Sequence, residues 1–514
     1  MPSDAELYAQ SRALVKAGKP NEAYKLALDL VMKKTDLWEP YYEAAVFSFY
    51  NNDERSAQGF FRLAAQREKD SAVSTQDLTN LLLAQGKYGE ALDIWKRKLE
   101  APVSKRDLAA FLEFLSGDHV TEERAEDFFR GRVGGPKVQY PGFCHLMRQG
   151  SLPGKVEVIP EEPIPPECVH YYNMQAPGAS GSSFSSIWVH ELSDAIVRPY
   201  SDLVIMGDKG IIPDFFNLEE HLLYDTFIRR SIPLAGGDIV LVSKEAVRKR
   251  LPTGVVLTSY TINNWTHFLT EIMPIVAMTE ALGIPTHVPL LISKPLASQM
   301  MDFLNLIKSP ERAIEIISCP TQVVEAIWFT PVSTVPFEYL KSRCGVTVHY
   351  SPSELLFSPA ALAALKESIS HHCSSDHENP PVKVFIDRES ALRRVTNREE
   401  VVHYFSEAGY VIARPELMTL REQMELFSRA TVIVGQSGAG LANMVFAPPG
   451  SKIIILSGNP EDPGPHCYFP NLARALGHET HYMAFGLPMT DLHIDFEVDL
   501  KELVPLLHSL LAGT

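Results

Sequence analysis

The class of fold is determined by the stretch Ala430-Thr-Val-Ile-Val-Gly435-Gln-Ser-Gly-Ala-Gly440-Leu-Ala-Asn443-Met-Val-Phe446. Its β-branched run from Thr431 to Val434 predicts a buried parallel strand. The three glycines that follow permit a tight turn close to a ligand, and the apolar segment after them predicts a helix. A helix N-terminus carries unpaired N–H groups and a partial positive charge, so this layout suits a phosphate. The same glycines could also serve only to shape the strand-to-helix connection.

The spacing of these glycines separates the stretch from two familiar nucleotide-binding motifs. Gly435, Gly438 and Gly440 form the pattern G-x-x-G-x-G. This is neither the G-x-G-x-x-G of a dinucleotide fold nor a P-loop, since no Gly-Lys-Ser/Thr follows. No acidic residue ends the next strand about 20 residues on, where a dinucleotide fold would hold the ribose. An oxidoreductase with a dinucleotide site is therefore disfavoured.

Arginines follow an earlier predicted strand, Val382 to Ile386, at positions 388, 393 and 394. In an open α/β sheet, ligands bind just beyond the carboxyl ends of the strands. Arginines at that edge can hold a diphosphate through paired hydrogen bonds, or can simply be solvated at a helix start. The next predicted strand, Tyr410 to Ala413, is followed by Glu416, which can accept hydrogen bonds from ribose or sugar hydroxyls or can cap a helix.

These segments, in this order, resemble the C-terminal half of glycosyltransferase family 61. The positions that match the family's signatures are Arg388, Arg394, Asn397, Pro415, Glu416, Glu422, Gln423, Gly435, Gly438, Ala439, Gly440, Leu441, Asn443, Phe446, Pro449 and Gly450. The family's N-terminal signature also appears, as Asn264-Trp265-Thr266-His267-Phe268-Leu-Thr-Glu271. One position departs, because Ser437 stands where the family has a histidine and supplies only a shorter hydroxyl. The resemblance covers roughly Cys168 to the C-terminus.

The resemblance implies an α/β fold of the GT-B type, a pair of Rossmann-like halves with the donor in the C-terminal half and the acceptor against the N-terminal half. It implies an inverting transfer from a nucleotide-diphosphate sugar to a glycan or other hydroxyl acceptor. No metal and no further cofactor are expected, since arginines and helix termini neutralise the leaving diphosphate. The sheet region contains no Asp-x-Asp, in agreement with this expectation.

Roles for the candidate site residues follow from the same resemblance. His267 and Glu271 lie four residues apart, so a helix places them on one face, and either could be the general base with the other orienting it. A purely structural role for the pair is the alternative. In the donor half, Arg388 and Arg394 would hold the diphosphate, Glu416 the ribose, and Gly438 to Gly440 would offer backbone N–H groups. The donor-binding set is Arg388, Arg394, Asn397, Glu416, Ser437, Gly438, Ala439, Gly440 and Asn443.

The N-terminal region contains a repeat whose period is the tetratricopeptide length. It relates Gly18, Asn52 and Gly86, and it also relates Ala23, Ala57 and Ala91. The small alanines would let paired helices approach, and the first set would form the turns between them. Such an all-α repeat domain could dock a protein partner or a second copy of the chain, or could serve only as a structural extension. With the Ser437 departure, it also permits a non-catalytic assembly protein of polysaccharide synthesis that binds nucleotide or glycan.

Breaks in the hydrophobic pattern indicate the domain boundaries, and composition narrows the class of protein. We expect TPR-like repeats over 1–102, a helical linker region over 103–166, an acceptor-side half over 167–370 and a donor-binding half over 371–514. A net charge of −16 argues against nonspecific nucleic-acid binding. The sequence has no long apolar run that could span a membrane and no signal pattern at its start, so a cytoplasmic, bacterial-type member is expected, with peripheral attachment to the inner membrane left open.

Overall fold

The protein is described here from a computed structural model. The described residues are 2–16, 19–50, 53–68, 73–84, 87, 90–91, 94–95, 141–152, 154–166, 168–174, 182–214, 231–233, 239–243, 247–259, 261–293, 296–334, 355–372, 380–388, 393–458, 463–485 and 495–511. The chain divides into two compact units. The first comprises Met1–Pro141, Ser231–Val242 and Tyr339–Val346, and the second comprises Gly142–Arg230, Ser243–Glu338 and Thr347–Thr514. Each unit is described by itself.

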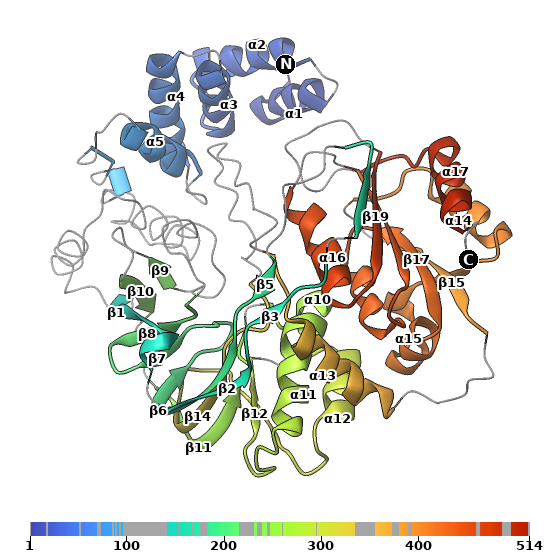
Figure 1. Cartoon of the computed structure of the whole chain (residues 1–514). Helices are drawn as coiled ribbons and strands as arrows, with labels where there is room; N and C mark the ends of the chain where they lie inside the picture. The colour runs from blue at the N-terminus through green and yellow to red at the C-terminus, as the bar shows by residue number, and fades with distance from the viewer. Residues whose placement is uncertain are drawn as a thin grey trace. The chain divides into compact units, whose positions relative to one another are not determined.

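The first unit begins with a series of helices in which every second helix starts about one repeat period further along the chain. Figure 1 shows these helices at the N-terminus. They are α1 (Asp4–Lys16), α2 (Pro20–Met32), α3 (Glu39–Tyr50), α4 (Glu54–Arg67) and α5 (Val73–Ala84). α4 starts one full period after α2, and α5 starts one full period after α3. The alanines of the repeat, Ala23, Ala57 and Ala91, are buried, as close helix packing requires. Elsewhere in this unit, β9 (Ser231–Pro233) and β10 (Ile239–Ser243) pair antiparallel.

One polar contact recurs in successive repeats. The Tyr8 hydroxyl donates to Glu43, and the Tyr42 hydroxyl donates to Asp77, at the same sequence separation of 35 residues. The N-terminal region is thus all-α and internally periodic, while its assignment as tetratricopeptide repeats stays a prediction. The predicted turn positions Gly18, Asn52 and Gly86 lie outside the described residues, as do residues 101–140 of the predicted linker.

The second unit contains a mixed sheet whose parallel part has a Rossmann-like strand order. Four parallel strands run in the order β13-β12-β11-β14, so the first strand along the chain lies between the second and the fourth. They are β11 (Lys249–Val256), β12 (Leu290–Ile292), β13 (Ile314–Ile316) and β14 (Thr321–Phe329). These four strands lie within 167–370, the segment predicted to form the acceptor-side half.

An antiparallel extension continues this sheet from β14. The order runs on through β6, β7 and β8, β1 lies parallel to β8, and β2 pairs with β6. The bounds are β1 (Pro141–Arg148), β2 (Lys155–Ile159), β6 (Ile187–Val197), β7 (Val204–Met206) and β8 (Lys209–Ile212), and a separate small sheet joins β3 (Glu162–Pro163) to β5 (Ser183–Phe184).

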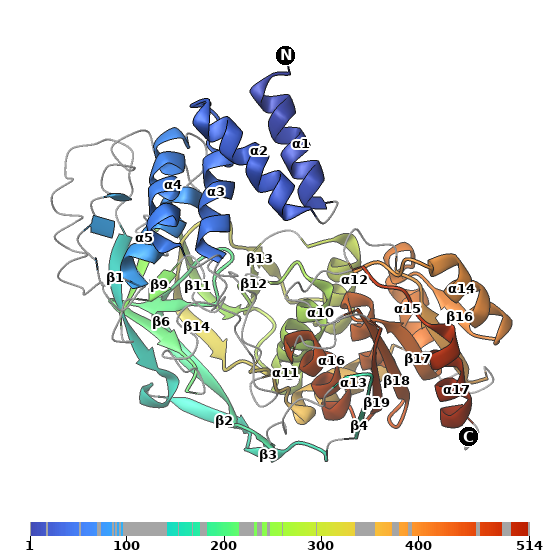
Figure 2. The ribbon, with the colours of Figure 1, turned by 90° about the horizontal axis from the view of Figure 1, so that it is seen from above.

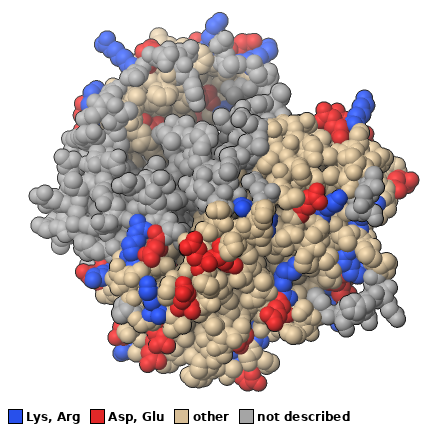
Figure 3. Space-filling view, in the orientation of Figure 1, with Lys and Arg blue, Asp and Glu red and all other residues tan. Residues whose placement is uncertain are grey.

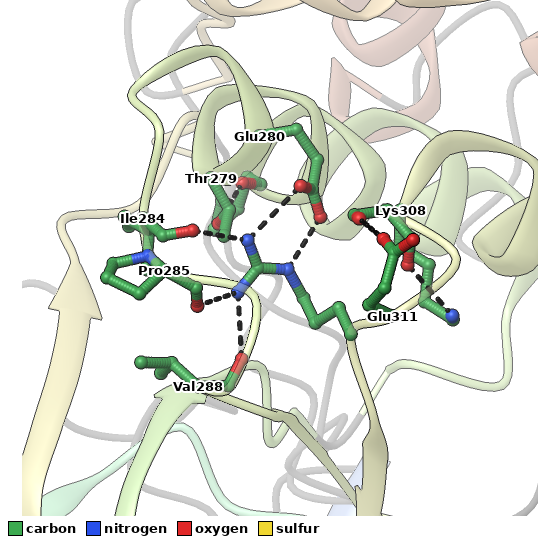
Figure 4. A network of polar contacts seen from close by, with 10 residues as sticks. Thr279, Glu280, Ile284, Pro285, Val288, Lys308 and Glu311 are labelled. Carbon is green, nitrogen blue, oxygen red and sulfur yellow. Dashed lines mark hydrogen bonds and ion pairs between the residues drawn. The ribbon is translucent and has the colours of Figure 1, made fainter.

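Helices α10 (Trp265–His267) and α11 (Met273–Ala281), with the π-helical turn η2 (Phe268–Ile272) between them, follow β11 as one continuous run. The end of this run is fixed by Arg312, whose side chain is fully buried. Its guanidinium donates to both carboxylate oxygens of Glu280 and to the carbonyls of three residues in the loop that leads to β12, namely Ile284, Pro285 and Val288 (Figure 4). One side chain thereby ties a helix to the next strand.

The second sheet is entirely parallel, in the order β16-β15-β17-β18-β19-β4. Its strands are β15 (Val382–Ile386), β16 (Val411–Ala413), β17 (Ala430–Gln436), β18 (Lys452–Ser457), β19 (Glu479–Ala484) and β4 (Val169–Tyr172). The predicted strands at 382–386, 410–413 and 431–434 are confirmed as elements. The β-branched runs of β15 and β17 are largely buried in the sheet, whereas Val411 of the edge strand β16 is exposed. β4 lies in the segment predicted to form the other half, yet it pairs with β19 (Figure 2).

Helices cover both faces of this sheet. One face is packed by α14 (Arg398–Glu407) and α17 (Leu500–Leu511), through Phe405 and Leu503 among others. The other face is packed by α15 (Leu420–Phe427) and α16 (Pro463–Ala475), within a core shared with α11, α12 (Ser298–Ile307) and α13 (Pro359–Ser370). The second unit is therefore a mixed α/β structure in which both sheets contribute to one hydrophobic core. Its assignment as GT-B stays a prediction.

On the face drawn in Figure 3, acidic and basic side chains are interspersed over the described surface. None of the helices within the described residues has the length and apolar character needed to cross a membrane.

Candidate functional site

The second sheet has a point where the chain changes direction across it. β16 lies on one side of β15 and β17 lies on the other, so the connections leaving β15 and β17 diverge. In open α/β sheets this switch point forms a crevice at the carboxyl ends of the two strands. Ile386 and Gly435 are register partners at those ends, which brings Arg388 close to the glycine turn. A small pocket lies there, lined by Phe385, Ile386, Asp387, Arg388, Val395, Arg398, Val401, Gln436 and Leu456.

Two glycines of the turn allow it to pack directly on β15. A Cβ on Gly435 would lie 3.1 Å from Cβ of Ile386, and one on Gly440 would lie 3.0 Å from Cγ2 of the same residue. At Gly438 a Cβ would collide with Nη1 of Arg388. Gly438 has an extended backbone (φ 169°), so it is needed for space and not for its conformation. The turn therefore presents bare backbone to the guanidinium of Arg388.

The helix predicted after the turn is a 3₁₀ helix, η5 (Ala439–Phe446). Its first bond runs from the N–H of Leu441 to the carbonyl of Gly438. The helix ends at Phe446, and the next residue, Ala447, has an extended backbone. Ala447 precedes Pro448, and a residue before proline is disfavoured in the helical region. Ala439 and Gly440 thus stand in the first turn of a 3₁₀ helix that starts at the switch point.

Arg388 is a half-buried cation beside another cation. Its Nη1 is buried and has no hydrogen-bond partner among the residues that the structure describes. The pKa of Arg388 is lowered, first by burial and then by the charge of Arg393, while Glu416 raises it. Burying a guanidinium N–H without an acceptor costs free energy, so an anionic ligand that supplied the acceptor would be favoured here. The diphosphate contact of Arg388 stays a prediction, and this geometry is the reason to pursue it.

Two further buried polar groups at the same strand end have no hydrogen-bond partner in the described ranges. They are the hydroxyl of Ser437 and Nε2 of Gln436. Buried polar groups are almost always hydrogen-bonded, so unused donors gathered at a switch point indicate a place for a ligand. Ser437 was a predicted donor contact. Gln436 was missed, although its position at the last residue of β17 could have indicated it.

Arg394 and Asn397, two of the predicted donor contacts, have other partners. The side chain of Arg394 donates to Asp495 at 2.9 and 2.7 Å, and Asp495 raises its pKa. Asn397 exchanges hydrogen bonds with the backbone of Val498 at 2.9 Å in both directions. The chain turns through a left-handed conformation at Arg393 (φ 58°) before this segment. Both side chains thus fasten the C-terminal segment, and their predicted contacts with the donor stay predictions, whereas Arg388 lies at the glycine turn.

A second arginine network beside the pocket is already satisfied. Asp387 is buried and receives two hydrogen bonds from Arg398, at 2.6 and 2.7 Å, and one from Arg414 at 2.8 Å. No role for Asp387 was expected from the sequence. Its charge compensates these two arginines and leaves Arg388 as the cation directed at the turn.

Glu416 is exposed on the 3₁₀ turn η4 (Pro415–Leu417), and its charge acts on Arg388. The turn is fixed by Gln423, whose Nε2 donates to the carbonyls of Pro415 and Met418. Asn443, predicted to contact the donor, instead donates to Oε1 of Gln423 at 3.1 Å. It also accepts from Nε1 of Trp265 at 3.0 Å. Asn443 therefore positions the turn that carries Glu416.

The acceptor-side candidates meet as their spacing predicts. The Asn264 side chain caps the helix by accepting from the N–H of Thr266. One turn later, Nδ1 of His267 lies 2.8 Å from Oε1 of Glu271, and both side chains are largely buried. Glu271 stands in the π-helical turn, a feature that often marks functional sites.

Tyr468 of α16 completes this pair. Its ring meets that of His267 edge to face, with centroids 5.7 Å apart. Its hydroxyl lies 3.2 Å from Oγ1 of Thr270 and hydrogen-bonds Glu271. Burial and the charge of Glu271 raise the pKa of Tyr468, so the phenol stays neutral and can donate to the carboxylate. No sequence signal marked this residue, because its partners lie far away along the chain.

The bond between Trp265 and Asn443 connects the two groups of candidates, since it joins the helix carrying His267 to η5. Comparison with known proteins shows a resemblance to one family over part of the chain. Residues 265–454 match the family model described as Glycosyltransferase 61. The match starts at the first residue of α10 and ends in β18, so it contains both the His267–Glu271 pair and the switch point. It indicates glycosyltransferase activity, with a sugar donor and an acceptor as substrates. A search of curated proteins found no match.

Proposed function

We propose, from the premise that residues 265–454 resemble glycosyltransferase 61, that this protein is an inverting glycosyltransferase. Its donor is a nucleotide-diphosphate sugar and its acceptor a hydroxyl of a glycan or similar molecule. The observation that carries the proposal is Nη1 of Arg388, which is buried against the bare backbone of Gly438 and has no partner within the described part of the chain. A pyrophosphate in this position would accept from the guanidinium and from N–H groups of the turn.

Donor binding then uses a smaller set of residues than the family signature suggests. Arg388 neutralises the diphosphate, with Arg393 raising the local positive potential. Ser437 and Gln436 supply donors that have no partner among the described residues. Glu416, whose charge acts on Arg388, accepts from ribose hydroxyls. Charge neutralisation by arginine and backbone is the means by which a leaving diphosphate is stabilised without a bound metal.

The chemical step needs a base on the acceptor side. With Nδ1–H of His267 donated to Glu271, the neutral imidazole carries its lone pair on Nε2, which can take the acceptor's hydroxyl proton. The acceptor oxygen forms a bond to the anomeric carbon from the face opposite the donor oxygen. The bond to the diphosphate breaks, and the nucleoside diphosphate leaves with that electron pair. Tyr468 holds Glu271 and packs on the imidazole.

The location of the enzyme and the role of its N-terminal helices are proposed from the sequence. We infer a cytoplasmic enzyme of surface polysaccharide synthesis whose periodic N-terminal helices dock a protein partner or a second copy. The recurring Tyr8–Glu43 and Tyr42–Asp77 contacts support a repeat built of equivalent units, as docking arrays are.

The test compares two arginines that the sequence treats alike. UDP and GDP are titrated into the full chain, and binding is measured by calorimetry. We expect one of them to bind, and Arg388→Ala to weaken that binding at least tenfold. Arg394→Ala should leave it unchanged, because this side chain is paired with Asp495. Unchanged binding in Arg388→Ala would overturn the proposed donor site.

A turnover assay then separates catalysis from binding alone. The nucleotide sugars of the bound nucleotide are incubated with the protein, and release of nucleoside diphosphate is followed. His267→Gln should lower the rate by about 10²–10⁴-fold, the range of a lost general base, with nucleotide affinity retained. Binding without turnover across sugars and acceptors would instead indicate a non-catalytic assembly protein, an alternative that Ser437 leaves open.

A further inference from the structure

Two histidines and a glutamate meet on the second sheet, away from the proposed donor site. They are His170 of β4 and Glu479 and His481 of β19, and their ligand atoms all lie within 4.8 Å of one another. His170 and His481 are register partners on adjacent parallel strands, so their side chains leave the same face of the sheet. Their rings stack with centroids 4.9 Å apart. Glu479 lies two residues before His481 and shares that face.

We propose that His170, Glu479 and His481 bind a zinc ion that fastens β4 to the rest of the second sheet. Two imidazole nitrogens and one carboxylate oxygen are a donor set that zinc takes in proteins, with the fourth position left to water. Magnesium and calcium prefer oxygen ligands and would not select this set.

The distances require only small shifts of the three side chains. Nε2 of His481 lies 2.9 Å from Oε1 of Glu479, and Nε2 of His170 lies 3.9 Å from the same oxygen. A tetrahedral ion with bonds of about 2.0–2.2 Å holds its ligand atoms roughly 3.3 Å apart. His170 is about half exposed (53%) and can rotate toward the ion, whereas His481 is held in the sheet at 1% exposure.

The arrangement around His481 is that of a metal-binding histidine. Its second ring nitrogen, Nδ1, lies 3.2 Å from the hydroxyl of Tyr172, on the strand that carries His170. When Nε2 binds a metal, Nδ1 becomes the N–H donor, and an oxygen at this place fixes the ring. The positive charge of Lys452 acts on His481 and would oppose a bound cation. The Nζ of Lys452 donates to the carbonyl of Leu510. The carboxylate of Glu479 offsets that charge.

The site is distinct from the proposed catalytic region. Glu479 is the first residue of β19, so the cluster lies toward the amino end of that strand, whereas the donor crevice lies at the carboxyl ends of β15 and β17. β18 and β19 separate β17 from β4 in the sheet. The ion would cross-link two segments that are far apart in sequence, and its role would be to stabilise the sheet.

The experiment measures zinc bound by the full chain. The protein is treated with EDTA, dialysed, and titrated with ZnCl₂ by calorimetry, with zinc content after gel filtration read by atomic absorption. We expect one zinc per chain at this site and a thermal midpoint raised by a few degrees. His170→Ala should weaken binding at least tenfold. This variant should fold, because His170 is exposed. Glu479→Gln should weaken it as well, and MgCl₂ should produce no binding heat.

Variants of histidines outside the proposed site serve as controls for the location of the bound zinc. His403→Ala removes an exposed histidine from α14, and a double His371→Ala, His372→Ala variant removes a pair near the end of α13. Neither change should alter zinc affinity at the proposed site. The proposal is overturned if the native chain binds no zinc, or if His170→Ala and Glu479→Gln bind it as the native chain does. Loss of binding in the control variants alone would also overturn it.

Discussion

The indole Nε1 of Trp265 donates a hydrogen bond to Oδ1 of Asn443, 3.0 Å away and 178 residues along the chain. The other end of the Asn443 amide donates to Gln423, so both of its polar ends are used. The side chain is fully buried. The Asn443 amide therefore connects the helix that begins at Trp265 with the 3₁₀ helix η5 that follows the glycine turn. This contact gives a structural reason for the two motifs to occur in the same chain.

Removing this amide should destabilise the protein. Asn443→Ala leaves both Trp265 and Gln423 with unsatisfied polar groups, for which we expect a loss of about 2–4 kcal/mol. Trp265→Phe removes one hydrogen bond, with an expected loss of about 1–2 kcal/mol. A double-mutant cycle from urea denaturation should give a coupling of roughly 1 kcal/mol. Additive effects would mean that the bond does not contribute.

The glycine at 438 should be required for nucleotide binding and not for folding. Gly438→Ala places a methyl group where Nη1 of Arg388 lies, so the guanidinium must move. The backbone there is extended, which alanine adopts without strain. We expect nucleoside diphosphate affinity to fall at least tenfold in calorimetry, with the thermal midpoint little changed. Gly59→Ala is the matched control, because nothing lies within 4 Å of its added Cβ. Equal affinity in both variants would contradict the proposed role.

Much of this site was predictable because its strands are short, β-branched and buried. The runs at 382–386 and 431–434 indicated where β15 and β17 lie, and strand ends are where ligands bind. The partners of each polar residue were not predictable. Arg388 and Arg394 look alike in sequence, but only Arg394 has Asp495 beside it, 101 residues away. Long-range pairing decides such contacts, and local pattern carries no signal for it.

Long-range pairing also explains two other features that the sequence did not indicate, the position of β4 and the contact of Tyr468. β4 joins the second sheet because its register with β19 satisfies a strand edge, although more than half of the chain lies between the two strands. Tyr468 reaches the His267–Glu271 pair because α16 packs on the face of that sheet which adjoins the shared core. By contrast, the contact between His267 and Glu271 depends only on helical spacing, and local sequence was enough to predict it.

Tyr468 should affect turnover more than binding. Tyr468→Phe keeps the ring against His267 and removes the hydroxyl that bonds Glu271. Loss of this restraint should lower kcat by roughly ten- to a hundredfold, because small displacements of a catalytic pair are amplified in rate. Nucleotide affinity should not change. Tyr404→Phe, on α14, provides the control and should retain native kcat. A Tyr468→Phe variant with native kcat would leave the hydroxyl without a positioning role.

Stability should fall in mild acid because of buried histidines. Burial lowers the pKa of His478 to about 4, from 6.5 in an unfolded chain, and its Nε2 contacts the carbonyl of Met444. Below about pH 6.5 the unfolded chain therefore binds more protons than the folded one, and stability is lost as pH falls toward 4. The loss is at most roughly 3 kcal/mol for this residue. Burial also lowers the pKa of His190 to about 4, so it adds a similar share.

Thermal midpoints between pH 7.5 and 4.5 check this expectation. His478→Gln removes one of the titrating groups, and the pH dependence should become clearly shallower without disappearing. A variant with the native slope would show that His478 does not titrate in this range.

Arg312 should be among the most important single side chains for stability. It is fully buried and donates to Glu280 and to three loop carbonyls. Removing one partner of a buried ion pair typically costs about 3–5 kcal/mol, because the remaining groups lose their compensation. Arg312→Met keeps most of the volume and isolates the polar loss. We expect a loss of that size in the urea transition of the second unit. Arg421→Ala, which breaks the exposed pair with Glu425, should cost less than about 0.5 kcal/mol. If Arg312→Met costs no more than this control, the network does not hold the end of α11 to β12.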